Sequence, residues 1–481
     1  MGGIVAALHK KERTATKAVF TMLKELSRCG MDTYVIASAK EQASADSMKE
    51  LDPEKIQSNI ALGYIFSKNL PKNTPQLFKT DNFTLAFEGR FYPSSKIYEK
   101  LKPNPEKTAE AIIKNCEGAY AFAIASPNSL IVGRDVMGVI PLYFGRNQIL
   151  FAVASERKAL WKLGLKAESF PPGNIAIIKK DNGFSFKPIK TITQPPPKPL
   201  TMDFAAKSLQ RLMLQSTKDR VCDVKEVAVA FSGGLDSSIV AFLARKCGIK
   251  TQLTTVGLEN MPETEYAEDA AKTLKIPIHV KTYTIDDVEK VLPKILWLIE
   301  EPNIVNASIA IPLYWAAELA SAHGLNILLA GQGADELFGG YHRYLSMYAE
   351  KSADTLQKTL LNDVARCYAT NFQRDNPVCM FHNVELRLPF TDLRVVNFAL
   401  SLPLRLKIES PNDKLRKRVL RKVAENFALP PFIVNKPKKA IQYATGVSKA
   451  LQKLAKRENL NPSHYVRKVF RKIFPDVRLD D

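Results

Sequence analysis

The segment Glu226–Ser238 reads EVAVAFSGGLDSS and decides the fold of the larger part of this chain. Its apolar first half predicts a buried strand, and its second half turns on two consecutive glycines into the apolar helical pattern of 237–247. Paired glycines let several backbone amides point inward, and the following helix directs its positive N-terminal end at the same point. Such a turn binds phosphate, and Asp236 can hold a magnesium ion against it. The Walker pattern GxxxxGK[ST] is absent from this segment, which argues against a γ-phosphate kinase loop.

Strands and helices alternate after this segment. We expect strands at 250–257, 277–283 and 326–330, and helices at 264–274, 288–301 and 311–323. Alternation of this kind implies a parallel α/β sheet, whose ligands bind at the carboxyl ends of the strands. Beyond about Tyr344 we expect helices to the end of the chain.

The first part of the chain has a different pattern. Short apolar runs with β character follow one another, and helices are expected only near 16–29 and 108–116. The stretch TQPPPKPL at 193–200 lacks backbone donors at its prolines and favours an extended linker. The sequence therefore predicts a sheet-rich layered domain at 1–193, a linker at 194–202 and an α/β domain at 203–481.

Composition narrows the class of protein. With 481 residues, 46% hydrophobic and 25% charged, the chain is long enough for two or three globular domains. Its 69 Lys and Arg exceed its 49 Asp and Glu, and the net charge of +20 favours an anionic partner. The apolar stretches are too short for a membrane span, and six cysteines without a CxxC pair indicate neither a disulfide framework nor a zinc site. We expect a cytoplasmic protein.

Several motifs carry a resemblance to a known family. SGGLDSS is the pyrophosphatase-loop (PP-loop) signature of N-type ATP pyrophosphatases, and the chain around it resembles glutamine-dependent asparagine synthetase. Further matching segments occur in family order: Arg134–Tyr143, Ala154–Leu160, Pro171–Gly173, Thr255–Leu258, Gly331–Tyr341, Glu385–Asp392 and Lys438–Tyr443. The resemblance covers nearly the whole chain.

The resemblance implies a fold and a reaction. The fold would be an N-terminal-nucleophile-like αββα domain followed by an α/β ATP-pyrophosphatase domain, of the adenine nucleotide α-hydrolase-like kind, with a helical C-terminal part. In that family ATP reacts with the β-carboxylate of aspartate to give an acyl-adenylate and pyrophosphate, and ammonia then displaces AMP to leave an amide. ATP, Mg²⁺, aspartate and ammonia or another amine are the expected partners, and a homodimer is compatible with the family.

The resemblance also assigns roles to residues of this sequence. The PP-loop would hold pyrophosphate, two apolar residues would flank adenine, a glycine would lie beside the ribose, and two aspartates would share magnesium. Pyrophosphate would be held by Ser232, Gly233, Gly234, Asp236 and Ser237, and adenine would be flanked by Ala230 and Val256. The glycine beside the ribose would be Gly331, and the magnesium ligands would be Asp236 and Asp335. Lys439, with Lys438 as the second choice, would neutralise the departing pyrophosphate. Arg387 and Asp392 are expected to form a buried ion pair.

Position 332 departs from the family pattern. Members that make asparagine carry Glu where this chain has Gln332, placed to act on the incoming ammonia. An amide cannot take up that proton, so general-base help from this position is lost. Either ammonia reacts without it, or the amine and the carboxylate are different.

The N-terminal domain departs further. The family's nucleophile is Cys at position 2, but this chain has Gly2, and Phe87–Arg90 reads FEGR where the family has an Asn-Gly oxyanion hole. Around Gly63–Phe66 the glutamine-binding Arg is missing. Since three parts of the site are lost together, we expect an inactive domain that does not hydrolyse glutamine.

Three other functions stay open at this point. β-Lactam synthetases are similar in plan and also lack the Cys, but they need a Tyr and Glu pair that the sequence does not place. RNA binding or tRNA modification has support from the tail, because residues 403–481 hold twenty basic and seven acidic residues and YVRKVFRK at 465–472 interleaves aromatics with cations. A helix is expected at 414–422 with a basic face. A pseudoenzyme without turnover is the third.

Overall fold

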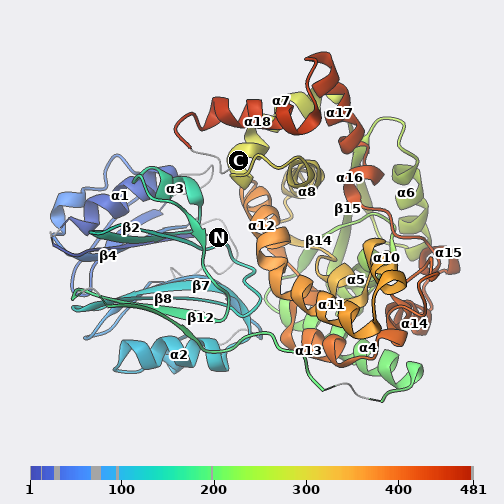
Figure 1. Ribbon diagram of the computed structural model, residues 1–481, viewed down its shortest axis with the longest axis horizontal. Helices are drawn as coiled ribbons and strands as arrows, with labels where there is room; N and C mark the ends of the chain where they lie inside the picture. The colour runs from blue at the N-terminus through green and yellow to red at the C-terminus, as the bar shows by residue number, and fades with distance from the viewer. Residues whose placement is uncertain are drawn as a thin grey trace. The chain divides into compact units, whose positions relative to one another are not determined.

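The computed structural model describes residues 2–11, 14–26, 33–66, 77–93, 97–181, 183–196 and 199–477. The chain forms two compact units, Met1–Thr191 and Ile192–Asp481 (Figure 1). Residues 27–29 of the first expected helix and residues 197–198 of the expected linker lie outside the described residues.

The first unit has two antiparallel sheets between helices. One sheet has the order β11-β9-β10-β1-β4-β2-β3 and the other the order β13-β12-β8-β7-β6-β5. Helices α1 and α3 cover the first sheet and α2 covers the second (Figure 1). The expected αββα layering is confirmed. The helices are α1 (Ala15–Glu25), α2 (Pro105–Asn115) and α3 (Arg157–Trp161).

The strands of this unit are short and mostly buried. Those of the first sheet are β1 (Gly2–His9), β2 (Thr33–Ala37), β3 (Gln42–Ala45), β4 (Ile60–Phe66), β9 (Tyr143–Arg146), β10 (Leu150–Ala154) and β11 (Glu168–Ser169). Those of the second are β5 (Leu77–Lys79), β6 (Thr84–Phe91), β7 (Gly118–Ala125), β8 (Ser129–Arg134), β12 (Asn174–Lys179) and β13 (Phe184–Pro188). Strands β1 and β4 are covered on both faces, which is why they read as continuous apolar runs rather than alternating ones.

The second unit is built on a five-stranded parallel sheet with the order β16-β15-β14-β17-β18. Its strands are β14 (Glu226–Ala230), β15 (Lys250–Leu258), β16 (Ile278–Tyr283), β17 (Ile327–Leu329) and β18 (Glu385–Arg387). The chain winds outward from β14 in one direction and returns on its other side through β17. Between β14 and β17 the strand order therefore reverses, and in open parallel sheets ligands bind at such a point, beyond the carboxyl ends of the strands.

Helices surround this sheet and form the rest of the unit (Figure 1). They are α4 (Met202–Val221), α5 (Leu235–Lys246), α6 (Pro262–Leu274), α7 (Ile285–Ile299), α8 (Ile304–Ala322), α9 (Ala334–Phe338), α10 (Arg343–Glu350), α11 (Ala353–Cys367), α12 (Gln373–Met380), α13 (Leu393–Ser401), α14 (Arg418–Asn426), α15 (Pro431–Val434), α16 (Ile441–Ala444), α17 (Val447–Arg457) and α18 (Pro462–Ile473). Within the described residues, α8 alone is long and apolar enough to cross a membrane by length and composition, and 67% of that window is buried inside the fold. It packs against α7 and α12, as a core helix does.

Two sequence predictions for this unit are wrong. The region beyond Tyr344 is not wholly helical, because Glu385–Arg387 forms β18, whose three residues are too few to give a period-2 signal. The helix expected at 414–422 begins only at Arg418, since Arg416 and Lys417 both have φ of 53° and cannot belong to a right-handed helix.

The expected ion pair between Arg387 and Asp392 is also wrong. Arg387 bonds instead to Asp223, 2.6 Å away, and to Glu385, 2.8 Å away. Asp392 pairs with Arg220 at 3.1 Å and with Arg394 at 2.6 Å. Both residues are buried, so each is satisfied within a separate charged cluster.

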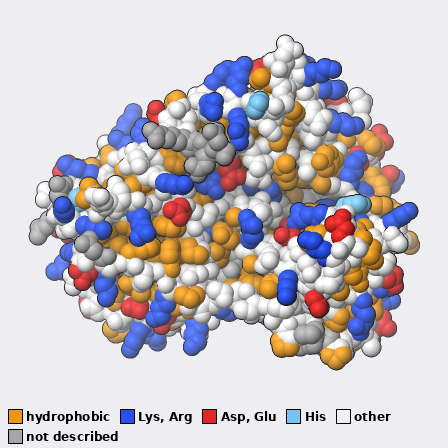
Figure 2. All heavy atoms as spheres, in the orientation of Figure 1, with side chains coloured by type: hydrophobic (Ala, Val, Ile, Leu, Met, Phe, Trp, Pro, Cys, Tyr) orange, Lys and Arg blue, Asp and Glu red, His pale blue; other side chains and the backbone are white. Residues whose placement is uncertain are grey.

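The basic tail, residues 403–481, exposes many of its cations to solvent but buries the aromatic residues of its last helix. Figure 2 shows Lys and Arg side chains gathered over the surface that α17 and α18 form, and the exposed ones include Lys449, Lys453, Lys456, Arg471 and Lys472. Tyr465 and Phe470, in contrast, are only 3% and 1% exposed and pack into the unit. They cannot stack on RNA bases, so the aromatic part of the RNA hypothesis is lost and an amphipathic helix with a solvated basic face accounts for the pattern.

Candidate active site

The glycine turn leaves β14 and opens α5. Gly234 is the N-cap of α5, and Gly233 has a φ of 64°. A Cβ at Gly233 would come within 2.9 Å of the Tyr266 ring and 3.2 Å of the Ala267 Cα, so only glycine fits. The hydroxyls of Ser232 and Ser237 lie 3.3 Å apart across the turn. The backbone amides and the helix N-terminus thus face the space beyond β14, as phosphate binding requires.

The second motif leaves β17 and meets the first. Gly331 lies so close to α5 that a Cβ there would be 2.9 Å from the Cβ of Asp236. Gly333, with a φ of 92°, turns the chain into α9 and places Asp335 in its first turn. Segments about 100 residues apart in the sequence are therefore side by side at the point where the strand order reverses.

Lys417 joins the two aspartates. Its Nζ lies 2.6 Å from Oδ2 of Asp236 and 2.6 Å from Oδ1 of Asp335. The lysine side chain is only 4% exposed. A Cβ at Gly340 would collide with both Asp335 and the Lys417 Cε, which explains the glycine at that position. The sequence did not single out Lys417, because it is one of six basic residues within the nine positions 414–422, which together read as a solvated face.

Two neighbouring lysines differ in what they contact. Lys438 lies 2.6 Å from Oδ2 of Asp335, whereas Lys439 pairs with Glu263 and is 47% exposed. Burial raises the pKa of Asp335, but Lys417 and Lys438 outweigh burial and hold that pKa below its ordinary value. Burial lowers the pKa of Lys438, but Asp335 and Asp236 outweigh it and raise this pKa above the ordinary value. Lys438 is therefore a charged, anchored cation, and Lys439 lies at the rim.

The loop that carries these lysines is held by Arg421. Its guanidinium donates to backbone carbonyls of Arg416 at 2.8 Å, of Leu415 at 2.5 Å, of Lys436 at 3.3 Å and of Val434. Four of its hydrogen bonds thus go to main-chain oxygens on both sides of α14 and α15, and this fixes the path of the chain from Val434 to Lys436.

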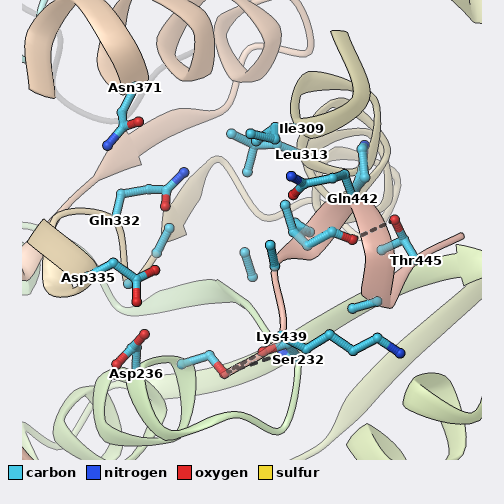
Figure 3. Close-up of a pocket in the computed structure, with 18 of the residues that line it drawn as sticks. Ser232, Asp236, Ile309, Leu313, Gln332, Asp335, Asn371, Lys439, Gln442 and Thr445 are labelled. Carbon is cyan, nitrogen blue, oxygen red and sulfur yellow. Dashed lines mark hydrogen bonds between the residues drawn. The ribbon is translucent and has the colours of Figure 1, made fainter. Parts of the chain in front are cut away.

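The motifs line one cavity of about 890 Å³ (Figure 3). Most of the residues predicted from the sequence border it, namely Ala230, Ser232, Asp236, Ser237, Val256, Gly331, Gln332, Asp335, Lys438 and Lys439. Gly234 borders a smaller neighbouring cavity of about 80 Å³, together with Lys417, Arg421 and Lys436. Gly233 lines neither cavity and serves the backbone turn instead.

Polar side chains continue along one wall of the larger cavity. Figure 3 shows Asp236, Asp335, Gln332 and Asn371 following one another on that wall, with Ile309 and Leu313 opposite. Glu336 is buried and accepts hydrogen bonds from Tyr341 Oη at 2.7 Å and from Asn371 Nδ2 at 2.8 Å. Burial and the charge of Asp335 raise the pKa of Glu336. Asn371 was not predicted, because it lies in a helical segment that matches no quoted motif.

The two aspartates fit a magnesium ion bound jointly with a phosphate. Magnesium in nucleotide sites takes one or two carboxylates plus phosphate oxygens and water, and Asp236 and Asp335 supply such a pair. Oδ1 of Asp236 is buried and has no hydrogen-bond partner, so it is available as a ligand. Among the described residues there is no group of three or more His, Cys, Asp or Glu that could hold a metal alone.

The three positions expected to lack amidotransferase chemistry lie on β1, on β4, which contains Gly63–Phe66, and on β6. A Cβ at Gly2 would be 2.1 Å from the backbone oxygen of Ile65, so the strand pairing leaves no space for a side chain there. Glu88, where the family has Asn, is 2% exposed and accepts a hydrogen bond from Ser155 Oγ at 2.7 Å. A buried carboxylate thus occupies the position at which the family resemblance implies an oxyanion donor.

Comparisons with known proteins identify two matching sequence families. The family described as asparagine synthase matches residues 208–474, and a glutamine amidotransferase domain family matches residues 72–162. A protein of Methanocaldococcus jannaschii, provisionally named asparagine synthetase (glutamine-hydrolyzing) 1, is 31% identical, over 95% of this chain and 96% of its own. Asparagine synthetase B of Escherichia coli is 26% identical, over 70% of this chain and 62% of its own.

Similarity to solved structures is weaker. The structure of an allosteric regulatory enzyme of purine biosynthesis has a TM-score of 0.34 at 15% identity and covers 54% of this chain and 66% of its own. The structure of an NMN synthetase from Francisella tularensis has a TM-score of 0.29 at 13% identity and covers 59% of this chain and 99% of its own. These scores carry no conclusion. The matched sequence families span both units and the cavity at the sheet's reversal point, and on that ground the chain belongs to the asparagine synthase family.

Proposed function

We propose that the protein is an ATP-dependent amide-forming ligase that adenylates a carboxylate, aspartate by family resemblance, and transfers ammonia or another amine to it. The observation that carries this proposal is the meeting of Asp236 and Asp335 beneath the glycine turn, with Lys417 and Lys438 against them. Two acids for a magnesium ion, backbone amides for phosphate and two cations for a departing anion thus lie together where the large cavity meets its small neighbour.

The first step forms the acyl-adenylate. A carboxylate oxygen attacks the α-phosphorus of ATP, the bond from that phosphorus to the bridging oxygen breaks, and pyrophosphate leaves with the electron pair. In the proposal Ser232, Gly234 and Ser237 hold the pyrophosphate portion, while Ala230 and Val256 flank adenine and Gly331 lies beside the ribose. Magnesium, when bound at Asp236 and Asp335, neutralises charge on the phosphates.

The cation that stabilises the departing pyrophosphate is assigned to Lys438 in preference to Lys439. Lys438 is anchored on Asp335 and faces the same space as the glycine turn, whereas Lys439 is engaged by Glu263 and half-exposed. Lys417 and Lys436 lie in the adjoining small cavity and add to the positive potential there.

The second step forms the amide. The nitrogen of a neutral amine attacks the carbonyl carbon, the bond from that carbon to the phosphate oxygen breaks, AMP leaves, and the surplus proton of the amine passes to a phosphate oxygen of AMP or to water. Free ammonia or an amine is the proposed donor, since Gly2 offers no nucleophile at its position and Glu88 opposes an oxyanion. The first unit is proposed to serve as a scaffold without glutaminase activity.

One observation bears on the β-lactam-synthetase-like alternative, but it does not distinguish that enzyme from an asparagine-synthetase-like one. A Tyr and Glu pair does exist in the cavity wall, because Tyr341 Oη donates to Glu336 at 2.7 Å. Both residues belong to the Gly331–Tyr341 segment that already resembles asparagine synthetase. The pair therefore favours neither enzyme over the other.

The test is release of pyrophosphate from ATP and Mg²⁺, screened over aspartate, other amino acids and tRNA, with and without ammonium. Release with aspartate, and amide formation once ammonium is added, is the expected result. Release that depends on tRNA would replace the proposal by an RNA-modifying enzyme. An absence of exchange between ATP and pyrophosphate with every carboxylate would identify a pseudoenzyme.

A further inference from the structure

Gln332 is held by a buried carboxylate on another helix. Its Nε2 lies 2.6 Å from Oδ2 of Asp375, which belongs to α12 and is 0% exposed. The two residues are 43 positions apart in the sequence. Gln332 itself lines the large cavity, between Asp335 and Asn371 on the polar wall (Figure 3). Asp375 does not line the cavity, but its two partners Gln332 and Arg374 both do, so it contacts the ligand space only through them.

This contact determines which way the Gln332 amide points. A carboxylate can only accept hydrogen bonds, so the amide must turn its NH₂ group toward Asp375. The carbonyl Oε1 is then the polar atom that Gln332 has left for the cavity. An amide that could rotate freely would offer a donor or an acceptor, whereas this one offers an acceptor.

Asp375 is itself fixed on its other side. Arg374 Nε donates to Oδ1 of Asp375 at 2.7 Å, and Arg374 Nη1 donates to the carbonyl of Thr370 at 2.9 Å. Arg374 is 5% exposed, so the pair is buried and its geometry is constrained. The segment Tyr368–Phe372 just before it is a π-helix, a distortion that recurs at functional sites.

We propose that Asp375 is a positioning residue, which fixes Gln332 so that its carbonyl oxygen accepts a hydrogen bond from the N–H of the incoming neutral amine. The inference rests on the proposed function and deepens it, since it names the acceptor that replaces the family's Glu at this position. The amide orients the amine but takes no proton. When the new C–N bond forms and the bond to AMP breaks, the surplus proton passes to a phosphate oxygen of the departing AMP or to water.

A consequence for the amine follows from this arrangement. Because no side chain at position 332 can deprotonate an ammonium ion, only the neutral fraction reacts. At a fixed total ammonium concentration well below its KM, and below the pKa of ammonium, the rate of amide formation rises about tenfold per pH unit, in proportion to free ammonia.

The test combines two variants and two readouts. In Asp375→Asn, Arg374 still needs an acceptor, so the Asn oxygen faces Arg374 and its NH₂ group faces Gln332. The Gln332 amide must then flip and present a donor to the cavity. We expect the KM for ammonium to rise about tenfold or more. The rate of ATP–pyrophosphate exchange should change much less, because exchange requires no amine.

The rescue variant is Gln332→Glu combined with Asp375→Asn. Its Glu accepts from the Asn NH₂ group and again turns an oxygen toward the cavity, so the KM for ammonium should return toward the wild-type value. If Asp375 only balances the charge of Arg374, Asp375→Asn should change the exchange rate and the KM for ammonium to a similar extent. The double variant should then restore neither quantity, and this result would overturn the inference.

Gln332→Met keeps the Asp375–Arg374 pair whole and tests the same hydrogen bond should Asp375→Asn fail to fold. It should raise the KM for ammonium to a similar extent, and an unchanged KM contradicts the inference. A wild-type protein without any ATP–pyrophosphate exchange contradicts the proposed function itself, and the inference falls with it. If the wild type catalyses exchange but substitutions at Asp375 and Gln332 leave the KM for ammonium unchanged, the inference is wrong while the proposed function stands.

Discussion

The ammonium of Lys417 lies 2.6 Å from a carboxylate oxygen of Asp236, across 181 residues of sequence. The same ammonium reaches Asp335, so one buried cation bridges two acids that would otherwise repel each other, and Lys438 supplies the second positive charge. Lys417 adopts left-handed backbone angles to reach them. Its presence lets the acid pair persist when no other cation is bound.

Replacing Lys417 by Met should destabilise the second unit by about 3 kcal/mol, because Asp236 and Asp335, only 18% and 13% exposed, lose their shared cation while Asp335 keeps Lys438. Thermal unfolding with and without Mg²⁺ measures this, and Mg²⁺ should raise the Tm of the variant more than that of the wild type. Lys414→Met, at an exposed position of the same basic run, is the control. An equal response to Mg²⁺ in variant and wild type would contradict a magnesium site at these aspartates.

Lys438 and Lys439 should separate clearly in a matched pair of variants. Lys438→Met removes the cation anchored on Asp335 and should lower ATP–pyrophosphate exchange about 100-fold or more, as loss of an oxyanion-stabilising group does. Lys439→Met should cause a much smaller loss, because its ammonium is engaged by Glu263. The reverse order of effects would return the role to Lys439.

Affinity for ATP should depend on pH through Lys436. Burial lowers the pKa of Lys436 to about 8, and its ammonium lies over the Tyr266 ring, 3.2 Å from the centroid. The protonated form attracts phosphate, so the KM for ATP should stay constant below pH 8 and rise above it, by up to about tenfold per pH unit. Lys436→Met should have a raised and flatter KM from about pH 7 to about pH 9. A wild-type KM that is flat across this range would exclude Lys436 from the ATP site.

Glutamine hydrolysis should be absent and should not be restored by one substitution. Gly2→Cys would place a Cβ 2.1 Å from the Ile65 oxygen, so the strand must shift before a thiol can be accommodated. We expect glutamate release from glutamine to stay at the level of a heat-killed control in both wild type and variant. Release above that control in the wild type would disprove the scaffold role proposed for the first unit.

Stability should depend on pH through Lys407. Burial lowers the pKa of Lys407 to about 7 from 10.5, so between these values the unfolded chain binds more protons and stability rises with pH. Lys407→Met should therefore have a higher Tm than the wild type, by the largest margin below pH 7 and by almost none near pH 10.5. A difference in Tm that stays constant as the pH rises would show that folding does not lower the pKa of Lys407.

Much of the fold could be predicted from strand patterns and glycine positions. The strand of Glu226–Ser238 and the alternation after it gave a parallel sheet, because buried parallel strands read as apolar runs. The sheet's fifth strand could not be predicted, since β18 has only three residues and its pairing with β17 is set by tertiary packing. Helix α14 was placed too early for a similar reason, because the contact of Lys417 with two distant acids overrides local helix propensity.

Some residues of the candidate site could likewise be predicted from the sequence, and others could not. Asp236, Gly331 and Asp335 stand in motifs whose residue types alone suggest phosphate and metal chemistry. Lys417 and Asp375 do not, since a lysine in a basic run and an aspartate beside an arginine read as surface residues until the fold buries them. The choice between Lys438 and Lys439 likewise depended on which side chain turns inward, and adjacent positions are equivalent in sequence.

The way Arg421 is used has a consequence for how this site can change over evolution or in design. Because its guanidinium holds neighbouring segments through carbonyl oxygens, the path of the chain from Val434 to Lys436 depends little on the side chains along it. Substitutions there can alter which charges meet the ligand while the backbone stays in place. The loop is therefore a suitable region for retargeting specificity, and Arg421 is the residue that such variation must leave untouched.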